Sequence, residues 1–582
     1  MRKNYLPLFI HQIRTRLVLA ASLITLLAAG STARAQAPAW QNIAVANQSL
    51  GGYSQIRATA TDASGNVYVA GVFSLTTTLG NISLTSSAGE SDVFVAKWSP
   101  ATNSFVWAQR IGGIGSDEVT ALTVRDNSVY VVGNFGSPTL SIGNTTLVNA
   151  DANAGSYDVF VAKFSDAGPL AWAQRAGGEG FDYSTSVAVN GTNVYVGGYF
   201  YGLTSVFGGT TLTNASTTRT TTDAFIAKLT DTGNAGNFNW AQQASGTGDE
   251  AVAGLATNGA NVYAVGNFQS TSVGFGSTTL ANAGVNDMFV AKLVDAGSSS
   301  SFAWAQRAGG TGAESAMAVA VNGTNVYMAG GFSSAMAGFG GVTLNNAGLS
   351  DIFVAKLTDA GSNGNFVWAQ RAGGTNAEYA ASVTTSGANV YLAGTFQSAP
   401  AAFGTISLAN SGGRDIFVTK LTDAGLTSNF AWALAGGGAG SDIGQSVAVS
   451  GTNVYAAGYV ATPASFGNSA IPTSAGYQVG VLAALTDAQA LATTAPASTA
   501  GMLMYPNPAH TTATVLLPSG HGGTQATLIL NDALGRTVKA CTAALPMAGS
   551  QYILDLTGLT PGVYTLQVQA GITRAVRQLI ID

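Results

Sequence analysis

The sequence repeats one phrase at a fixed interval: "SFAWAQRAGG" at 301–310, "FVWAQRAGG" at 366–374 and "FAWALAGGG" at 430–438. One Trp marks each copy, and seven such Trp are spaced 67, 65, 68, 64, 64 and 64 residues apart: Trp40, Trp107, Trp172, Trp240, Trp304, Trp368 and Trp432. Only Trp98 lies outside the series. A period of this length predicts a repeat architecture.

Each unit contains four runs that are typical of β-strands. Between Trp304 and Trp368 they are "ESAMAVAV" (314–321), "VYMAGGF" (326–332), "DIFVAKL" (351–357) and "FVWAQ" (366–370). Gly, Asn and Asp clusters separate the runs, which favours antiparallel strands joined by tight turns. A longer connection, "FGGVTLNNAG" (339–348), joins the second run to the third.

Seven units of four strands predict an all-β fold with a seven-bladed β-propeller. A solenoid is the alternative, but it would need capping repeats at its ends. Here the ends complement each other, because "AWQNIA" (39–44) supplies a fourth strand alone, whereas the last unit ends at its third, "VGVLAAL" (479–485). We therefore expect the N-terminal strand to complete the last blade and close the ring.

The repeated phrases resemble the SBBP repeats of bacterial β-propellers. The matching pieces are "GTNVYMAGGF" (323–332), "DIFVAKLTDAG" (351–361) and "WAQRAGG" (368–374), with close copies in most units. The resemblance covers about residues 39–488 and implies the fold, but no particular activity.

The N-terminus has the features of a secretory signal peptide. Basic residues precede an apolar stretch at 17–30, and "ARA" (33–35) supplies a cleavage pattern, so residues 1–35 are expected to be removed. No other stretch is long and apolar enough to span a membrane. The single cysteine, Cys541, precludes an internal disulfide, and a net charge of −5 gives no basic face for nucleic acid.

The C-terminal region lacks the repeated phrases and differs from the repeats in its sequence pattern. An Ala/Thr/Ser-rich linker (489–501) separates the propeller (36–488) from residues 502–582, in which alternating runs predict a small Ig-like β-sandwich. "YPNPA", "DALGR" and "LDLTGLTPGVYTLQV" resemble, in this order, the type A C-terminal sorting domain of the type IX secretion system of Bacteroidota. The resemblance implies the secretion machinery as a partner, and a protein released from the cell or held on its surface.

A recurrent acid is the main candidate for a site. The three His lie outside the repeats, so His-based catalysis and His-based zinc sites are excluded there. Ten residues after the marker Trp, six units carry Asp117, Asp182, Glu250, Glu314, Glu378 and Asp442, and Gly52 takes this place in the seventh. A carboxylate ring at one channel mouth would bind calcium or a basic ligand. Alternatively, each acid accepts backbone N–H bonds from its adjacent "GG" turn. No cofactor other than calcium is expected.

Two further charged positions recur. "DIFVAK" contributes an Asp and a Lys, such as Asp351 and Lys356, which face opposite sides of one strand and are expected to pair with a neighbouring blade or turn. The Arg of "WAQR", such as Arg307, is expected to pair with the acid seven residues later.

Three functions remain open. The first is a non-catalytic secreted or surface propeller that binds a glycan or protein through loops on one face, since the recurrent acid and the variable connections (148–158 and 213–223) are expected at the same end. The second is a carboxylate-based polysaccharide lyase or glycosidase, which would need an acid pair that other blades do not share. The third is a structural or adhesive surface protein. No catalytic or cofactor-binding residue is assigned.

Overall fold

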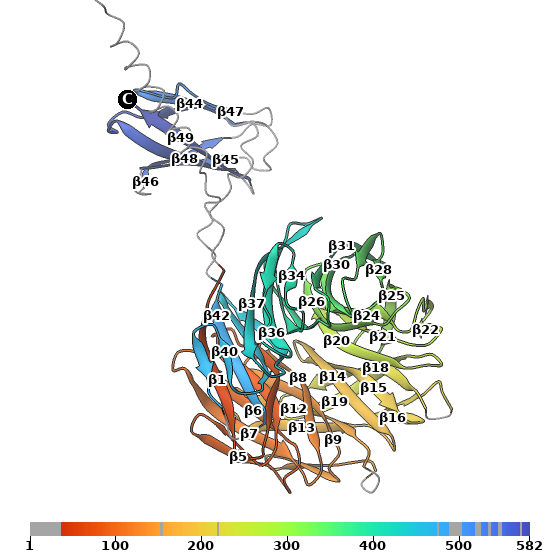
Figure 1. The fold of residues 1–582 in the computed structure, drawn as a ribbon. Coiled ribbons are helices and arrows are strands. Elements are labelled where there is room, and N and C mark those ends of the chain that lie inside the picture. The colour runs from red at the N-terminus through yellow and green to blue at the C-terminus, as the bar shows by residue number, and fades with distance from the viewer. Residues whose placement is uncertain are drawn as a thin grey trace, which may run out of the picture. The chain divides into compact units, whose positions relative to one another are not determined.

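The computed structural model describes residues 37–151, 155–217, 220–473, 477–487, 503–517, 525–532, 537–544, 550–570 and 573–582. The predicted signal peptide and the linker at 489–501 lie outside these residues. The described residues form strands and no helix, so none of them forms a helix able to cross a membrane. The chain divides into two compact units, residues 1–487 and 488–582 (Figure 1).

The first unit consists of antiparallel sheets built on a recurring group of four strands. The first strands of these groups are β2 (Ser54–Thr61), β8 (Asp117–Arg125), β14 (Phe181–Asn190), β20 (Glu250–Asn258), β26 (Glu314–Asn322), β32 (Tyr379–Ser386) and β38 (Ile443–Ser450). The second strands are β3 (Val67–Phe73), β9 (Ser128–Phe135), β15 (Asn193–Tyr201), β21 (Asn261–Phe268), β27 (Asn325–Phe332), β33 (Asn389–Phe396) and β39 (Asn453–Val460).

The third strands are β6 (Asp92–Ser99), β12 (Asp158–Ser165), β18 (Thr222–Asp231), β24 (Asp287–Asp295), β30 (Asp351–Asp359), β36 (Asp415–Asp423) and β42 (Val479–Thr486). The fourth are β7 (Ser104–Gly112), β13 (Leu170–Ala176), β19 (Gly236–Ala244), β25 (Ser300–Gly309), β31 (Gly364–Gly373), β37 (Ser428–Gly438) and, from the other end of the chain, β1 (Trp40–Gln48). Each first strand contacts the first strand of the next group, and β38 contacts β2.

The expected pairing of the N-terminal strand is confirmed. β1 lies antiparallel to β42, with Trp40 opposite Leu485 and Ala46 opposite Gly480 (Figure 1). The last group therefore contains β38, β39, β42 and β1, although β1 lies more than 400 residues before its partner β42 in sequence.

The long connection between the second and third strands forms a hairpin that lies on the fourth strand of the preceding group. β4 (Thr76–Leu79), β10 (Thr139–Ile142), β28 (Met336–Phe339), β34 (Ala401–Phe403) and β40 (Ala464–Phe466) pair with β1, β7, β25, β31 and β37. Their partners in the hairpins are β5 (Ile82–Thr85), β11 (Thr145–Val148), β29 (Val342–Asn345), β35 (Ile406–Leu408) and β41 (Ser469–Ile471). The hairpins thus cover a sheet edge that would otherwise be open to other chains.

The two remaining hairpins are attached more loosely. The pair β16 (Thr204–Phe207) and β17 (Thr210–Thr213) is joined to the preceding group by a bond from Gly177 N to Val206 O of 3.0 Å. The pair β22 (Ser272–Phe275) and β23 (Thr278–Ala281) is joined by a bond from Gly274 N to Ser245 O of 3.1 Å.

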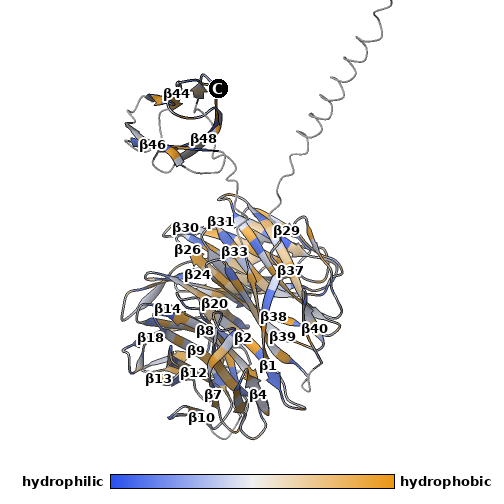
Figure 2. Ribbon diagram, turned by 90° about the vertical axis from the view of Figure 1, so that its left-hand side faces the viewer, coloured by the Kyte–Doolittle hydropathy of each residue, from blue (hydrophilic) through white to orange (hydrophobic). Residues whose placement is uncertain are grey.

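The core of the first unit lies between neighbouring sheets. The second and third strands are buried on both faces; every residue of β3, for example, is buried. One core cluster joins Tyr263 and Val290 of one sheet to Val326 and Phe353 of the next. Figure 2 shows hydrophobic residues distributed over many strands of this unit. Burial on both faces explains why the second and third runs are apolar throughout rather than alternating.

The second unit has two antiparallel sheets. One contains β43 (Leu503–Tyr505), β44 (Thr512–Leu517) and β47 (Ser550–Asp555). The other contains β45 (Gln525–Asn531), β46 (Thr537–Ala544), β48 (Gly562–Ala570) and β49 (Thr573–Ile581). Val515 and Leu554 of the first sheet share a core with Leu528 and Leu566 of the second.

Candidate functional site

A cavity of about 390 Å³ is lined by residues from all seven first strands. Each of these strands carries a β-bulge near its middle, where one residue has no partner on the second strand. The seven bulge residues all line the cavity: Arg57, Thr120, Thr185, Ala253, Met317, Ala381 and Gln445. A bulge turns one side chain out of the regular alternation of the strand. The repeated bulge therefore adds one residue of each first strand to the lining of the cavity.

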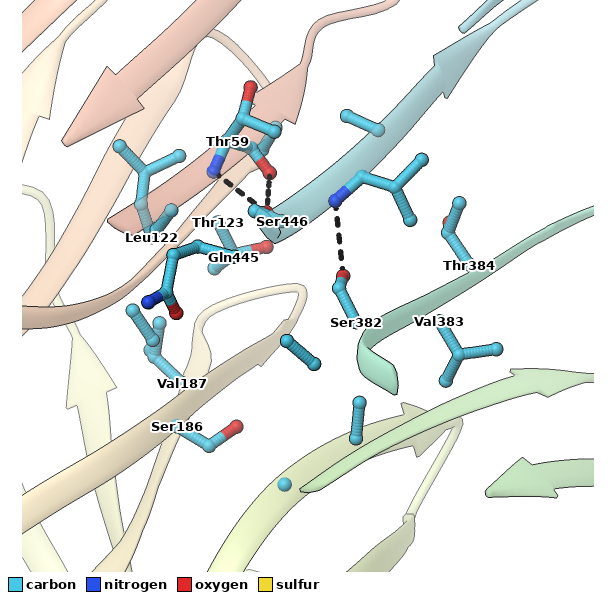
Figure 3. A pocket seen from close by; sticks show the side chains of 18 of the residues that line it. Thr59, Leu122, Thr123, Ser186, Val187, Ser382, Val383, Thr384, Gln445 and Ser446 are labelled. Carbon is cyan, nitrogen blue, oxygen red and sulfur yellow. Dashed lines mark hydrogen bonds between the residues drawn. The ribbon is translucent and has the colours of Figure 1, made fainter. Parts of the chain in front are cut away.

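Hydroxyl groups join neighbouring first strands around the cavity. Ser446 Oγ accepts a hydrogen bond of 3.0 Å from the backbone N of Thr59, and Ser382 Oγ accepts one of 3.2 Å from the backbone N of Val447 (Figure 3). Ser186 Oγ likewise accepts a bond of 2.9 Å from the backbone N of Leu255. These short polar side chains fix the spacing of the strands and leave a lining of hydroxyl, amide and small aliphatic groups.

Of the described residues that line the cavity, Arg57 is the one with a charged side chain. Its Nη1 lies 3.5 Å from Glu118 Oε2, and its Nη2 donates a bond of 3.2 Å to Gln55 Oε1. Both charged side chains keep about a third of their surface exposed, 31% for Arg57 and 39% for Glu118. The cavity therefore offers donors and acceptors to a polar ligand, with one exposed ion pair beside it.

The six recurrent acids are buried, and five of them accept a hydrogen bond from the turn that precedes them. Gly310 N donates to Glu314 Oε2 at 2.9 Å, and Ser334 N donates to Oε1 at 3.0 Å. Equivalent bonds from the preceding turn reach Asp117, Asp182, Glu378 and Asp442, whereas Glu250 accepts from Ser270 N at 3.2 Å. Five of the six acids thus have the bonds that the structural interpretation predicts, and Glu250 does not.

Burial raises the pKa of several of these acids. It raises the pKa of Asp117, Asp182 and Glu250 to about 7 and that of Asp442 to about 6, and a nearby second Asp adds to each shift. Among the residues that the structure describes, no three Asp, Glu, His or Cys side chains are grouped so as to hold a metal ion. Calcium binding by the six acids stays a prediction, and calorimetry with calcium is its test.

The nearby second acid is the Asp of "DIFVAK". Its carboxyl group and that of the recurrent acid both lie close to the same glycine of the turn. A Cβ atom at Gly309 would lie 2.2 Å from Asp287 Oδ1 and 2.9 Å from Glu314 Oε2, and Gly309 has a φ of +145°. A side chain is therefore excluded there by space and by backbone conformation. Within the described part of the chain, the Oδ1 atom of this Asp has no hydrogen-bond partner in six units: Asp92, Asp158, Asp223, Asp287, Asp351 and Asp415.

The prediction that the recurrent Arg pairs with the acid seven residues later is wrong. Arg307 Nη1 lies 2.7 Å from Asp287 Oδ2 and not against Glu314, and Arg175 and Arg371 pair in the same way with Asp158 and Asp351. The fourth and third strands of one sheet are direct neighbours, with Arg307 opposite Phe289, so the Asp of the third strand lies closer than the acid beyond the turn.

The Lys of "DIFVAK" pairs with the next group of strands. Lys228 Nζ lies 2.6 Å from Asp295 Oδ2, which also accepts from Tyr195 Oη at 2.7 Å. Although burial opposes the shift, the bonds from Lys228 and Tyr195 lower the pKa of Asp295. Six junctions carry such a pair: Lys97–Asp166, Lys163–Asp231, Lys228–Asp295, Lys292–Asp359, Lys356–Asp423 and Lys420–Asp487. In each pair the Lys of one sheet is neutralised by the Asp of the next sheet, so these Lys serve contacts between sheets.

The recurrent acids and the variable connections lie at the same end of the sheets, here called the acid end. Asp117 at the start of β8 is opposite Phe135 at the end of β9, and Phe135 is opposite Asp158 at the start of β12. The connection at 148–158 therefore arrives where β8 begins, as expected from strand order.

One feature of the acid end was missed by the sequence reasoning. Tyr157, Phe181, Tyr183, Tyr199 and Tyr201 form a continuous aromatic cluster, with ring centroids 5.2–6.4 Å apart. The other units have mostly small or polar residues at these positions; Phe181, for instance, corresponds to Ser116, Asp249, Ala313, Ala377 and Ser441. A position-by-position comparison of the repeats would have found this exception.

Comparison with known proteins identifies the tail. Residues 503–582 match the family described as secretion system C-terminal sorting domain. This match indicates export by type IX secretion to the cell surface or the extracellular space, and it implies the secretion machinery as a partner. No curated protein matches the chain.

The similar solved structures are distant. A Pyrococcus horikoshii acylaminoacyl peptidase is 8% identical, with a TM-score of 0.31, over 78% of this chain and 58% of the peptidase. A Synechocystis apocarotenoid oxygenase mutant is 9% identical, with a TM-score of 0.30, over 68% of this chain and 91% of the oxygenase. Dimeric latent PorU from Porphyromonas gingivalis is 9% identical, with a TM-score of 0.12, over 91% of this chain and 34% of PorU. The chain thus spans little more than half of the peptidase's length.

Proposed function

We propose that the first unit is a seven-bladed β-propeller of the SBBP type, from a member of the Bacteroidota, that binds an extracellular glycan or protein without catalysis. The second unit, a small Ig-like sandwich over residues 502–582, carries it out of the cell. Support for the propeller comes from the circular series of contacts among first strands, completed by β38 and β2, and from the pairing of β1 with β42.

The observation that carries the binding proposal is the difference between the two ends of the sheets. At the far end, the first and second strands are joined by short turns that vary little, such as "NGTN" (322–325) and "SGTN" (450–453). At the acid end, the connections differ in length and sequence between units. Variable loops on a rigid scaffold are a common basis of binding specificity.

A non-catalytic role fits the positions of the carboxylates. A glycosidase needs two carboxyl groups with separate roles at one substrate site. Here the buried acid pairs recur in six groups and are bonded into their turns. Glu118, beside the cavity, faces Arg57 rather than a second acid.

The test uses the full mature protein, immobilised and exposed to polysaccharides and to purified surface proteins of the producing cells. Replacing residues 148–158 by the shorter sequence of 280–287 should weaken binding at least tenfold. Exchanging "NGTN" (322–325) for "SGTN" at the far end should leave binding unchanged. Release of reducing or unsaturated sugars would overturn the non-catalytic proposal. Loss of cell adhesion on gene deletion, with no ligand in either panel, would favour a structural role.

A further inference from the structure

The aromatic cluster at the acid end is built from three adjacent strands. Tyr157 directly precedes β12, Phe181 and Tyr183 lie on β14, and Tyr199 and Tyr201 lie at the end of β15. The Phe181 and Tyr183 rings are nearly parallel, with an interplanar angle of 4°, and Tyr157 stacks on Tyr183 at 5.5 Å and 26°. The hydrogen bond from Asp182 N to Tyr157 O, 2.7 Å, joins the strands beneath the rings.

The cluster is not part of the repeat's ordinary core. The recurrent Tyr of the second strands, such as Tyr195, is fully buried, whereas Phe181 is 37% exposed and the four Tyr of the cluster are half-buried. Exposed aromatic side chains that are gathered in one place mark binding surfaces more often than singly exposed aliphatic ones. Among the described residues, one junction between two groups of strands, that of β12 with β14, carries this aromatic cluster, so the geometry of the repeat does not require it.

Charged groups lie next to the rings. Asn134, opposite Glu118 in the pairing of β8 with β9, accepts a bond of 2.7 Å from the backbone N of Ser184, the neighbour of Tyr183. Glu118 follows Asp117 on β8 as Tyr183 follows Asp182 on β14, and β8 contacts β14, so the two residues hold equivalent positions on neighbouring first strands. Burial and then the neighbouring Tyr199, Tyr157 and Glu118 raise the pKa of Tyr183 to about 12, so its hydroxyl stays protonated. The Arg57–Glu118 ion pair joins this surface to the cavity.

We propose that this aromatic surface, with Glu118 and Arg57, binds a sugar ring of an extracellular carbohydrate. The apolar C–H face of a pyranose packs on Phe181 and Tyr183, while Glu118 accepts hydrogen bonds from sugar hydroxyls and Arg57 donates to ring or hydroxyl oxygens. A carbohydrate presents an apolar face with polar edges, which matches rings flanked by an exposed ion pair. The inference rests on the proposed binding function and names its ligand class and its site.

The experiment measures binding of the full mature chain to immobilised xylan, β-glucan, mannan, chitin and lipopolysaccharide. Wild-type protein should bind at least one of them. Phe181→Ala and Glu118→Gln should each raise Kd at least tenfold, while Phe181→Trp should retain binding within threefold. Tyr477→Ala is the matched control, because Tyr477 is an aromatic residue at the acid end, 79% exposed and outside the cluster; it should leave Kd within twofold. Unchanged melting temperatures verify that the variants fold.

The outcomes separate the inference from the function on which it rests. If a carbohydrate binds wild type and Phe181→Ala with equal Kd, the inference is wrong and the proposed function stands. The same holds if wild type binds a purified surface protein and none of the five carbohydrates. If wild type binds neither class, both proposals fall.

Discussion

At the scale of single residues, Trp98 explains how the ring of contacts closes without an ion pair. At the junction of the last group of strands with the first, the usual Lys is replaced by Ala484 and the usual Asp by Pro100. The Trp98 ring is 2% exposed and packs edge-on against Tyr455, with centroids 6.1 Å apart. The one Trp outside the repeat series therefore supplies a large apolar contact at the junction where Ala484 and Pro100 stand in place of the Lys–Asp pair.

We expect Trp98→Ala to lower the free energy of unfolding by about 3–5 kcal/mol, because it removes a large buried ring and leaves a cavity at the junction. Urea unfolding of the mature chain measures the loss. Trp98→Leu is the matched control, because Leu occupies this position in five units (Leu229, Leu293, Leu357, Leu421 and Leu485); it should cost less. A change below about 1 kcal/mol for the Ala variant would show that the junction does not depend on Trp98.

The paired buried acids predict an unusual dependence of stability on pH. Burial, with the charge of Asp158, raises the pKa of Asp182 to about 7, so between about pH 4 and 7 the folded chain binds more protons than the unfolded chain. Asp182 contributes its full stabilisation of the folded chain below the pKa that this Asp has in the unfolded chain, and the stabilisation is lost as pH rises through about 7. Acids with a lowered pKa, such as Asp295, have the opposite effect: they stabilise the folded chain above about pH 4, and this stabilisation is lost as the pH falls further.

We therefore expect Asp182→Asn to flatten the decline in unfolding free energy between pH 5 and 8, since the amide cannot titrate. The amide oxygen of Asn can still accept the 2.8 Å bond from Gly178 N, so stability near pH 5, where the acid is already neutral, should change little. Urea titrations at four pH values measure both effects. Asp126→Asn, at an Asp side chain that is 80% exposed, serves as the control. A slope identical to that of wild type would contradict the raised pKa.

At the scale of elements, the N-terminal strand is the critical one. β1 covers the edge of β42 and also carries the hairpin that begins with β4. Deleting residues 36–46 exposes the edge of β42 and detaches this hairpin, so the melting temperature should fall by about 10 °C or more. Deleting 36–39 alone, which precedes the strand, should change it by no more than about 2 °C. Scanning calorimetry decides, and equal melting temperatures for the two deletions would refute a structural role for β1.

Much of the element order could be predicted because the repeat aligns seven copies of each strand. The period at Trp304, Trp368 and Trp432 and the incomplete ends predicted the pairing of β1 with β42, which the register confirms. The hairpins were not predicted as cross-sheet contacts, because a four-residue run such as "SVGF" (272–275) has no periodicity that identifies its partner. The pairing of Arg307 with Asp287 was missed for a related reason, since it depends on strand adjacency rather than on separation in sequence.

The candidate site was harder to predict, because binding surfaces depend on exceptions to the repeat. Aligning the copies draws attention to what they share, such as Glu314, whose bonds prove to belong to the turn. Tyr157 and Tyr183 lie 26 residues apart in sequence, and their stacking depends on the distance between β12 and β14 in space. The cavity lining was also not predicted, since nothing in the alternation of "RATAT" (57–61) identifies Arg57 as a bulge residue.

At the scale of the whole molecule, the two units have separate cores. The first unit ends at Asp487, where Asp487 Oδ2 accepts from Lys420 Nζ at 2.7 Å, so its last ion pair is complete without the second unit. The sorting-domain match begins at residue 503. A chain that ends at Asp487 should therefore keep the melting temperature of the first unit within about 2 °C, since all strands of that unit and its Lys420–Asp487 ion pair are retained. In the producing cells it should enter the periplasm and remain there, whereas the full chain reaches the surface or the medium. Cell fractionation with an antibody against the first unit measures the distribution, and a chain that ends at Ala484, which removes Asp487, is the comparison that should be less stable. Normal appearance of the shortened chain outside the cell would show that the export signal lies in the first unit.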